Sequence, residues 1–327
     1  MIKQFFILGC MALVVILCSC KKNNSGTSAT TADTNWVTYT TANGLVSNSV
    51  NAIAIDAQGN KWIGTEFGVS KFDGTHWTNY KGANTNNGLA DDNVTAIAID
   101  GQGNIWFGGY LGVSKFDGSN WTTYLSVTSV QAIAVDAQGN KWIGTLGSGL
   151  WKFNGTVWTN YTKTNGLVND SVWSIAIDPQ NNKWIATNGG ISEFMNSGGW
   201  SSYTLAASRA IVRVAIDLQG NKWLATMFGG VTKFDGTNFT VYNSANTGNG
   251  LKGDWITSLA IDNQGNKWFG TWQGWVSELS GVAWASYIPT NAFNGATAVP
   301  VNAIAVDAHG NKWFGLSQGG GVSEFKY

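Results

Sequence analysis

Residues 50–80 read VNAIAIDAQGNKWIGTEFGVSKFDGTHWTNY, and this stretch decides the fold. It contains four short segments rich in β-branched and aromatic residues, each bounded by Gly, Asp or Asn: Val50–Ile55, Lys61–Thr65, Val69–Phe72 and Trp77–Tyr80. Such segments between turn residues predict strands joined by tight hairpins. The unit is expected to be a four-stranded antiparallel sheet, with Asp73-Gly74 as a two-residue hairpin link.

The same unit recurs along the chain. The pattern Asp-x-x-Gly/Asn-Asn-x-Trp ends at seven tryptophans, Trp62, Trp106, Trp142, Trp184, Trp223, Trp268 and Trp313. Their successive spacings are 44, 36, 42, 39, 45 and 45 residues, which is the period of a four-stranded propeller blade. Ala stands two residues before each motif Asp, and Ile or Val stands one residue before it. Each first strand therefore has a small and a large face, as a sheet packed between two others requires.

A displaced outer strand indicates how the repeat closes. No Trp/Phe-x-x-Tyr segment follows Phe325, yet the segment occurs seven times, beginning at Trp36, Trp77, Trp121, Trp158, Trp200, Phe239 and Trp284. The copy at 36–39 precedes the first unit, so pairing it with the last unit completes that sheet and leaves no long bare edge. The sequence therefore predicts an all-β fold over residues 35–327: a seven-bladed β-propeller of four-stranded blades, closed by the strand at about 36–39. An open solenoid is the alternative.

Composition and cysteine positions exclude several classes of protein. The 19 basic and 19 acidic residues give zero net charge, and charged residues make up only 12%. Nucleic-acid binding driven by phosphate neutralisation is therefore not expected. All three cysteines, Cys10, Cys18 and Cys20, lie at the N-terminal end, which excludes a disulfide framework for the propeller.

Residues 1–19 have the features of a lipoprotein signal peptide. Lys3 precedes an apolar run from Phe5 to Leu17 that is too short to span a membrane. The segment Leu17-Cys18-Ser19-Cys20 resembles a bacterial lipobox, in which the lipidated cysteine, here Cys20, becomes the first residue. The alternative is an ordinary cleaved signal with an unmodified cysteine.

Residues 20–34 then comprise the lipidated cysteine and a flexible tether, because the stretch KKNNSGTSATTADT after Cys20 is polar and has no periodic pattern. Two or more acyl chains on one cysteine are enough for stable anchoring. Lys21 does not match the Asp that retains many such proteins in the inner membrane. The expected location is the outer membrane, facing the periplasm or the cell surface.

From residue 35 onward the repeat resembles the two-component regulator propeller repeat, which is found in ligand-sensing regions of bacterial sensor proteins. The matching elements are V-x-A-I-A-I-D, N-K-W-I-G-T, G-V-S-K-F and a lead-in Asn-Gly-Leu at 43–45, 87–89, 165–167 and 249–251. The proline that often follows Gly-Leu in that family is replaced by Val46, Ala90, Val168 and Lys252. The resemblance implies extracytoplasmic recognition of a ligand, in some relatives a glycan fragment. No spanning helix, kinase or receiver region follows Tyr327 in this sequence, so signalling by the chain alone is not expected.

The two ends of the predicted ring differ in sequence. The first and third hairpin links of each blade meet at one end, which consists of near-identical copies of D-A-Q-G-N and F-D-G-T and contains both histidines, His76 and His309. The second links and the blade-to-blade connections meet at the other end, where long connections occur at 81–93, 243–254 and 288–300. Binding residues concentrate on loops of a rigid scaffold, so any site is expected at this second-link end.

The positions of the tryptophans indicate which residues of this end form the site. Of the 18 tryptophans, five lie outside the regular second-strand and fourth-strand columns: Trp151, Trp173, Trp255, Trp272 and Trp275. Their flat rings suit stacking on sugars or peptides. Together with Glu66, Phe67, Tyr110, Arg213 and Phe228, they form the predicted ligand-binding set. The alternative is that these rings only fill gaps between blades.

Arg213 breaks a column that otherwise holds only Ala or Ser, at Ala52, Ala96, Ala132, Ser174, Ser258 and Ala303. A guanidinium beside the channel requires either a carboxylate partner within the structure or an anionic ligand. Both interpretations remain open at this point.

Catalytic signals are sparse. Glu66 and Asp91-Asp92 are expected near one another at the mouth of the first two blades, where two carboxylates could serve acid–base chemistry. Streptogramin lyase propellers look similar and use His and Glu with a divalent metal, but here both histidines belong to the opposite end. Each motif Asp is single in its blade, whereas Ca²⁺ takes six or more oxygen ligands. The motif aspartates are therefore expected to cap turns, and we expect no metal, cofactor or catalytic residue.

The sequence thus predicts a non-catalytic, extracytoplasmic propeller lipoprotein that binds either a ligand, such as a glycan or peptide, or a partner protein of the cell envelope. Its expected contact with the membrane is the lipid on Cys20. The alternatives are an envelope scaffold that works through protein–protein contacts and, less favoured, a propeller lyase or hydrolase.

Overall fold

The computed structural model describes residues 35–125, 129–205, 210–294 and 297–326. The predicted signal peptide, the lipidated Cys20 and the tether lie outside these residues. Within the part of the chain that the structure describes, no helix is long and apolar enough to cross a membrane.

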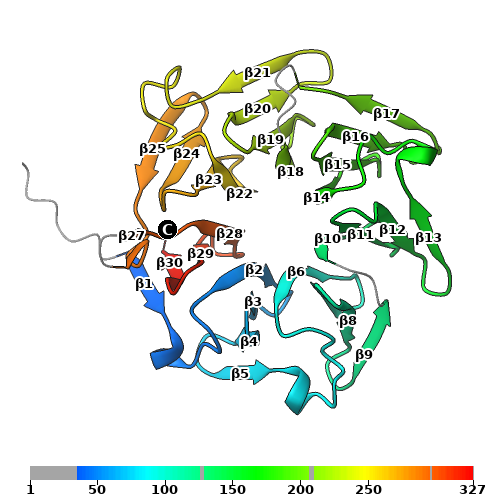
Figure 1. Cartoon of the computed structure of the whole chain (residues 1–327). Helices are drawn as coiled ribbons and strands as arrows, with labels where there is room; N and C mark the ends of the chain where they lie inside the picture. Colours follow the sequence, from blue (N-terminus) through cyan, green and yellow to red (C-terminus); the bar gives the residue numbers. More distant parts are fainter. Residues whose placement is uncertain (1–34, 126–128, 206–209, 295–296, 327) are drawn as a thin grey trace, which may run out of the picture. The chain divides into compact units, whose positions relative to one another are not determined.

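The described residues form a seven-bladed β-propeller, as predicted (Figure 1). Each blade is a four-stranded antiparallel sheet. The strands of blades 1 to 4 are β2 (Val50–Ile55), β3 (Lys61–Thr65), β4 (Gly68–Phe72), β5 (Trp77–Tyr80); β6 (Val94–Ile99), β7 (Ile105–Gly109), β8 (Gly112–Phe116), β9 (Trp121–Leu125); β10 (Val130–Val135), β11 (Lys141–Thr145), β12 (Leu150–Phe153), β13 (Trp158–Tyr161); and β14 (Val172–Ile177), β15 (Lys183–Thr187), β16 (Gly190–Phe194), β17 (Trp200–Tyr203).

Blades 5 to 7 repeat this order, except that the last blade takes its outer strand from the N-terminal side. Their strands are β18 (Ile211–Ile216), β19 (Lys222–Thr226), β20 (Gly230–Phe234), β21 (Phe239–Tyr242); β22 (Ile256–Ile261), β23 (Lys267–Thr271), β24 (Val276–Ser280), β25 (Ala283–Tyr287); and β28 (Val301–Val306), β29 (Lys312–Leu316), β30 (Gly321–Phe325), β1 (Trp36–Tyr39). The remaining short elements are the hairpin β26 (Phe293–Asn294) and β27 (Thr297–Ala298) and the 3-10 turns η1 (Thr41–Asn43), η2 (Gly82–Asn84) and η3 (Lys163–Asn165).

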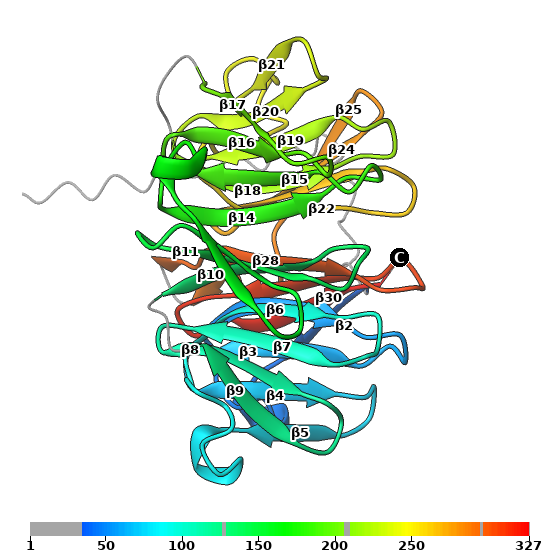
Figure 2. The ribbon, with the colours of Figure 1, turned by 90° about the vertical axis from the view of Figure 1, so that its right-hand side faces the viewer.

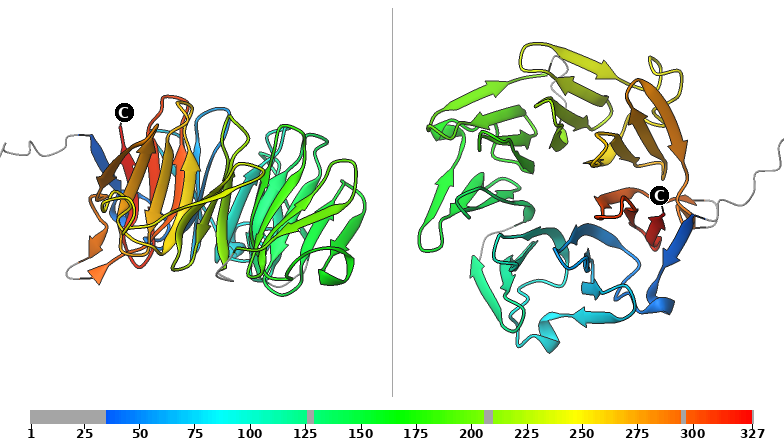
Figure 3. Two further views of the ribbon diagram at one scale, coloured as in Figure 1. Left: turned by 90° about the horizontal axis from the view of Figure 1, so that it is seen from above. Right: turned by 180° about the vertical axis from the view of Figure 1, so that it is seen from behind.

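The first strand of each blade lies innermost, and neighbouring first strands contact one another around the ring, including β28 with β2. With the ring on edge, the strands run between its two ends (Figures 2 and 3). All links and connections are therefore collected at these two ends, which positions any loop-built site.

Strand β1 closes the ring as predicted. It pairs antiparallel with β30, with Trp36 opposite Phe325 and Tyr39 opposite Val322. The Tyr39 hydroxyl donates a hydrogen bond of 3.0 Å to Glu324. Burial, and then the charge of Glu324, raise the pKa of Tyr39 well above its usual value. The two ends of the described propeller are thus joined by one shared sheet.

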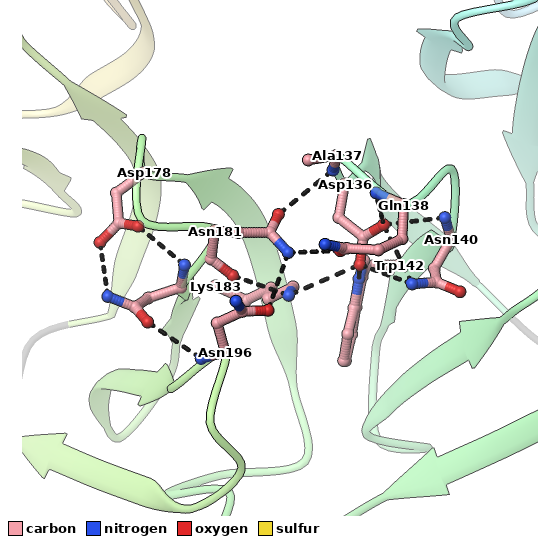
Figure 4. A network of polar contacts seen from close by, with 10 residues as sticks. Asp136, Ala137, Gln138, Asn140, Trp142, Asp178, Asn181, Lys183 and Asn196 are labelled. Atoms are coloured by element: carbon pink, nitrogen blue, oxygen red, sulfur yellow. Dashed lines mark hydrogen bonds and ion pairs between the residues drawn. The ribbon is translucent and has the colours of Figure 1, made fainter.

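The motif Asp builds the first hairpin link and also joins neighbouring blades (Figure 4). Asp136 accepts hydrogen bonds from the backbone N–H of Gln138 and Asn140, at 3.1 and 2.8 Å, and from the indole Nε1 of Trp142 at 2.9 Å. Lys183 of the next blade lies 3.5 Å from the Asp136 carboxylate and 5.1 Å from the centre of the Trp142 ring. Equivalent ion pairs join Lys141 to Asp100, Lys267 to Asp217 and Lys312 to Asp262. Turn capping is confirmed, and the ion pair to the next blade is an addition that the sequence did not predict.

The third hairpin link differs from the prediction. The Asp73 N–H donates to the His76 carbonyl at 3.3 Å, so the central pair of the turn is Gly74-Thr75 rather than Asp73-Gly74. Gly74 has a φ of 104°, a conformation that glycine adopts without a steric penalty. The Asp73 carboxylate caps the turn from outside by accepting the N–H groups of Thr75 and His76 at 2.8 and 2.7 Å.

Candidate functional site at the channel mouth

A β-bulge in the first strand of every blade turns one residue into the channel. In β2 the pairing with β3 shifts between Val50 and Ala52, so Asn51 has no partner position. The same shift recurs in the other six inner strands. A bulge re-aims the side chain that it carries. The seven bulge residues all line one cavity: Asn51, Thr95, Gln131, Trp173, Val212, Thr257 and Asn302.

This channel-mouth cavity has a volume of about 300 Å³, which is the lower end of the range for small-molecule sites. Glu66 and Tyr110, from the second links of blades 1 and 2, and Trp272, from that of blade 6, form part of its wall. It therefore lies at the second-link end, where the sequence predicted a site. Arg213 belongs to its lining and also to that of a second cavity of about 190 Å³ along the inner strands.

Blade 6 supplies an aromatic wall. Trp255 and Trp272 stack with ring centres 4.3 Å apart and an interplanar angle of 6°. Phe228, from the second link of blade 5, packs against Trp255 at 4.6 Å. The Trp272 side chain remains 40% exposed, so a broad indole surface faces solvent at the rim. On another part of the wall, Trp173 donates its indole N–H to Asn188 at 2.7 Å.

The polar bulge residues also link neighbouring blades through hydrogen bonds. Asn51 Nδ2 donates to the Val94 carbonyl at 3.3 Å, and Thr257 Oγ1 donates to the Val301 carbonyl at 2.7 Å. Asn302 closes the ring in the same way by donating to the Val50 carbonyl at 3.4 Å. Asn51 and Asn302 donate through their side-chain amide nitrogens, and Thr257 donates through its hydroxyl. Among the described residues, no hydrogen bond is found to the side-chain carbonyl oxygens of three cavity-lining amides: Asn51, Gln131 and Asn302.

Arg213 is held by the backbone rather than by an acid. It lies opposite Ala225 in the β18–β19 pairing, and its Nη1 donates to the Val212 carbonyl at 2.8 Å. Within the described ranges, no carboxylate forms an ion pair with its guanidinium. Burial lowers the pKa of Arg213 to about 10. Among the described residues that line the channel-mouth cavity, Glu66 is the single acid and Arg213 the single base.

Six of the ten predicted residues line the channel-mouth cavity: Glu66, Tyr110, Trp173, Arg213, Trp255 and Trp272. Phe228 contacts this group through Trp255. The structure does not bring the other three into the lining. Phe67 is 61% exposed beside Glu66 on the same link.

The remaining two tryptophans contact other parts of the propeller. Trp151 packs against the hydrophobic cluster shared by blades 2 and 3, and its indole nitrogen has no hydrogen-bond partner in the described part of the chain. Trp275 has the Lys252 ammonium 5.5 Å from its ring centre. For Trp151, the gap-filling interpretation describes the observed packing.

Sequence reasoning did not include the polar bulge residues in the candidate set, although all five of them line the cavity: Asn51, Thr95, Gln131, Thr257 and Asn302. Asn51, Thr95, Gln131 and Asn302 occupy the same column as Trp173 in other blades. The signal that could have found them is positional, because each stands directly before the Ala/Ser column that contains Arg213. Asn93, Met227 and Ile256 also line the cavity.

The acids that sequence placed near Glu66 are engaged in loop structure. The Asp91 carboxylate accepts the backbone N–H groups of Asn93 and Leu111 at 2.9 and 3.1 Å, and Asp92 accepts that of Gly82 at 2.7 Å. Neither lines the channel-mouth cavity. Both histidines lie in first or third hairpin links, at the opposite end. Over the described ranges, no group of three or more His, Cys, Asp or Glu side chains could hold a metal ion.

Comparison with known proteins supports the propeller class. The sequence model of the two component regulator propeller matches residues 44–67 and 88–110, which lie in blades 1 and 2. A comparison with curated proteins gives no match.

Solved structures share the fold at low sequence identity. The extracellular domain of BT3049 from B. thetaiotaomicron, described as a hybrid two component system, is 23% identical with a TM-score of 0.76 over 89% of this chain and 41% of that one. The extracellular domain of BT4673 from the same organism is 19% identical, with a TM-score of 0.72 over 90% and 40%. This chain thus spans about two fifths of the length of those structures. Virginiamycin B lyase from Staphylococcus aureus, in a catalytically inactive form with quinupristin, is 13% identical with a TM-score of 0.73 over 89% and 99%.

Proposed function

We propose that this chain is a non-catalytic, lipid-anchored propeller of the bacterial cell envelope that binds a small extracytoplasmic ligand in its channel-mouth cavity. The observation that carries the proposal is the convergence of Trp173, Trp255, Trp272 and Arg213 on that cavity. A regular blade does not need a tryptophan or an arginine at the positions of Trp173 and Arg213, because other blades carry small or polar residues there. A concave site with aromatic walls and a few convergent polar groups is the usual form of a small-ligand site.

Two further observations support binding rather than catalysis. In the part of the cavity lining that the structure describes, Glu66 has no second acid beside it and no histidine is present. The resemblance to extracellular domains of two-component systems favours a recognition role, whereas the likeness to a lyase rests on 13% identity. We place the ligand outside the cytoplasm because Cys20 follows a lipobox-like sequence.

Replacing Trp255 or Trp272 by Ala is expected to weaken ligand binding about fivefold, because each removes an aromatic stacking surface worth about 1 kcal/mol. A screen of oligosaccharides and peptides against the wild type, read by intrinsic Trp fluorescence and thermal shift, identifies the ligand. Isothermal titration then compares the variants.

The matched control is Trp275→Ala, which changes a tryptophan on the same link of blade 6 outside the cavity lining. Equal losses of affinity from Trp275→Ala and Trp272→Ala would contradict the assignment.

The envelope scaffold is retained as a second candidate because Phe67, Leu111 and Phe228 expose 61–64% of their surface at this end. Failure of every small ligand, together with co-purification of one fixed partner protein, would favour the scaffold.

Changing Cys20 to Ala is expected to abolish incorporation of a palmitate analogue and to release the protein from the membrane fraction. Anchoring by acyl chains depends on the one cysteine that carries them. The control is Cys18→Ala, which removes the neighbouring thiol and is expected to leave labelling intact. Labelling that persists in Cys20→Ala would refute the lipoprotein assignment.

A further inference from the structure

We propose that the ligand of the channel-mouth cavity carries a carboxylate, and that Arg213 binds this carboxylate. This inference rests on the proposed function and deepens it by naming the chemical class of the ligand. It does not extend to the rest of the ligand, which the cavity could accept as a sugar or as an acylated amino acid.

The first argument is that Arg213 lacks a partner of opposite charge. A buried guanidinium needs a carboxylate or several hydrogen-bond acceptors to offset the loss of water. Arg213 has one acceptor, the Val212 carbonyl, and no ion pair within the described residues. The fold already uses buried lysine–aspartate pairs between blades, for example Lys183 with Asp136. Arg213 does not belong to any of these ion pairs.

The second argument is that the blade does not need an arginine at this position. The equivalent residue is Ala in blades 1, 2, 3 and 7 and Ser in blades 4 and 6. A column built for small side chains packs well without a guanidinium. We therefore expect the arginine to reduce the stability of the empty protein, a cost that is typical of a binding residue.

The third argument is the complementarity of the remaining wall. The amide oxygens of Asn51, Gln131 and Asn302, to which no described residue donates, can accept hydrogen bonds from hydroxyl or N–H groups. Trp272 stacks on Trp255 and remains 40% exposed, so its exposed surface suits packing against a flat or sugar-like ring. Arg213 carries the one positive charge among the described lining residues, and its planar fork matches a carboxylate through two parallel hydrogen bonds.

The experiment uses two matched pairs of probes with the full propeller: cellobiouronic acid against cellobiose, and N-benzoylglycine against N-benzoylglycinamide. Each pair differs by the carboxylate, and the two pairs distinguish a sugar from an acylated amino acid. We expect at least one acid to bind about 10- to 100-fold more tightly than its neutral counterpart, the range of charge-assisted hydrogen bonds.

The decisive variant is Arg213→Ala. It is expected to abolish the preference for the acid and, without ligand, to raise the thermal midpoint by about 2–4 °C, since a partly buried cation without an ion pair among the described residues is removed. Glu66→Gln is the control of opposite sign: removing the negative charge of Glu66 from the lining should tighten binding of the acid about twofold at low salt.

The outcomes separate this inference from the proposed function. Neutral and acidic probes that bind equally well in wild type and Arg213→Ala, with binding lost in Trp255→Ala, would overturn the carboxylate assignment and leave ligand binding intact. An Arg213→Ala variant that is less stable than the wild type and keeps the preference for the acid would show that Arg213 is structural. Selective loss of acid binding in a more stable variant supports the proposal.

Discussion

A chain that lacks Trp36–Tyr39 is expected to lose its cooperative native state, because the deletion opens the propeller. The deletion leaves the outer edge of β30 unpaired, and such an edge is a template for aggregation. Thermal unfolding followed by circular dichroism and size-exclusion chromatography will measure the effect. We expect a broad transition at much lower temperature and an aggregated fraction.

The size of this effect follows from what β1 contacts. The Trp36 ring lies 4.9 Å from Phe325 and 5.5 Å from Phe314, and Tyr39 stacks on Trp313 at 5.6 Å. Truncating one packed aromatic side chain costs about 3–5 kcal/mol. Losing two therefore costs about 6–10 kcal/mol, which matches the entire net stability of a typical domain, about 5–15 kcal/mol.

A permuted chain tests whether the stability of the propeller depends on closure of the ring rather than on the order of its strands in the sequence. In it, residues 36–39 are removed from the N-terminal side and appended after Phe325 through a copy of the Asp235–Asn238 link of blade 5. This gives blade 7 the connectivity of the other blades. We expect the permuted chain to recover a sharp transition near that of the wild type. A permuted chain as unstable as the deletion would contradict the closure account.

The fold was predictable because its determinants are local and repeated. Seven copies of one motif gave the strand boundaries, and the missing outer strand after Phe325 gave the closure. The ion pair between Lys183 and Asp136 was not predictable in the same way, because its partners are far apart in sequence and meet only after neighbouring blades pack. The central pair of the third turn was misplaced because Asp73 caps the turn from outside it.

The site was partly predictable because breaks in a regular column stand out. Trp173 and Arg213 depart from their columns and line the channel-mouth cavity. Trp151 departs from its column as well, but its side chain packs between blades 2 and 3. A column break shows that a position is special, whereas the direction of its side chain depends on the bulge and on strand pairing.

Replacing Asp136 by Ala is expected to destabilise the propeller by about 3–5 kcal/mol, the usual result of stranding one member of a buried ion pair. The change removes the acceptor of the Trp142 indole and leaves the Lys183 ammonium, whose side chain is 4% exposed, without its carboxylate. Burial, the main cause, already lowers the pKa of Lys183 even with Asp136 present. Chemical denaturation of wild type and variant measures the difference in unfolding free energy.

Asp56→Ala is the matched control, because blade 2 carries Ile105 where the other blades carry the lysine. Asp56 caps the same turn and accepts the Trp62 indole at 2.9 Å, but no ion pair reaches it in the described structure. Its loss is therefore expected to cost only about 1–3 kcal/mol, the penalty for unmade hydrogen bonds. Adding Lys183→Met to Asp136→Ala should recover part of the stability, because it removes the stranded charge.

The pH dependence of the unfolding free energy provides an independent check on how much the charge of Asp136 contributes to stability. Burial raises the pKa of Asp136, but hydrogen bonds from Asn140 and Trp142 and the Lys183 charge together outweigh it, so the net pKa is lowered. A carboxyl whose pKa is lower in the folded state stabilises the fold above its unfolded pKa of about 4, and this contribution disappears as the pH falls through the folded value. The difference between wild type and Asp136→Ala should therefore be constant from about pH 5 to 8 and shrink in acid. A difference that stays constant down to pH 2 would mean that Asp136 acts through packing rather than through its charge.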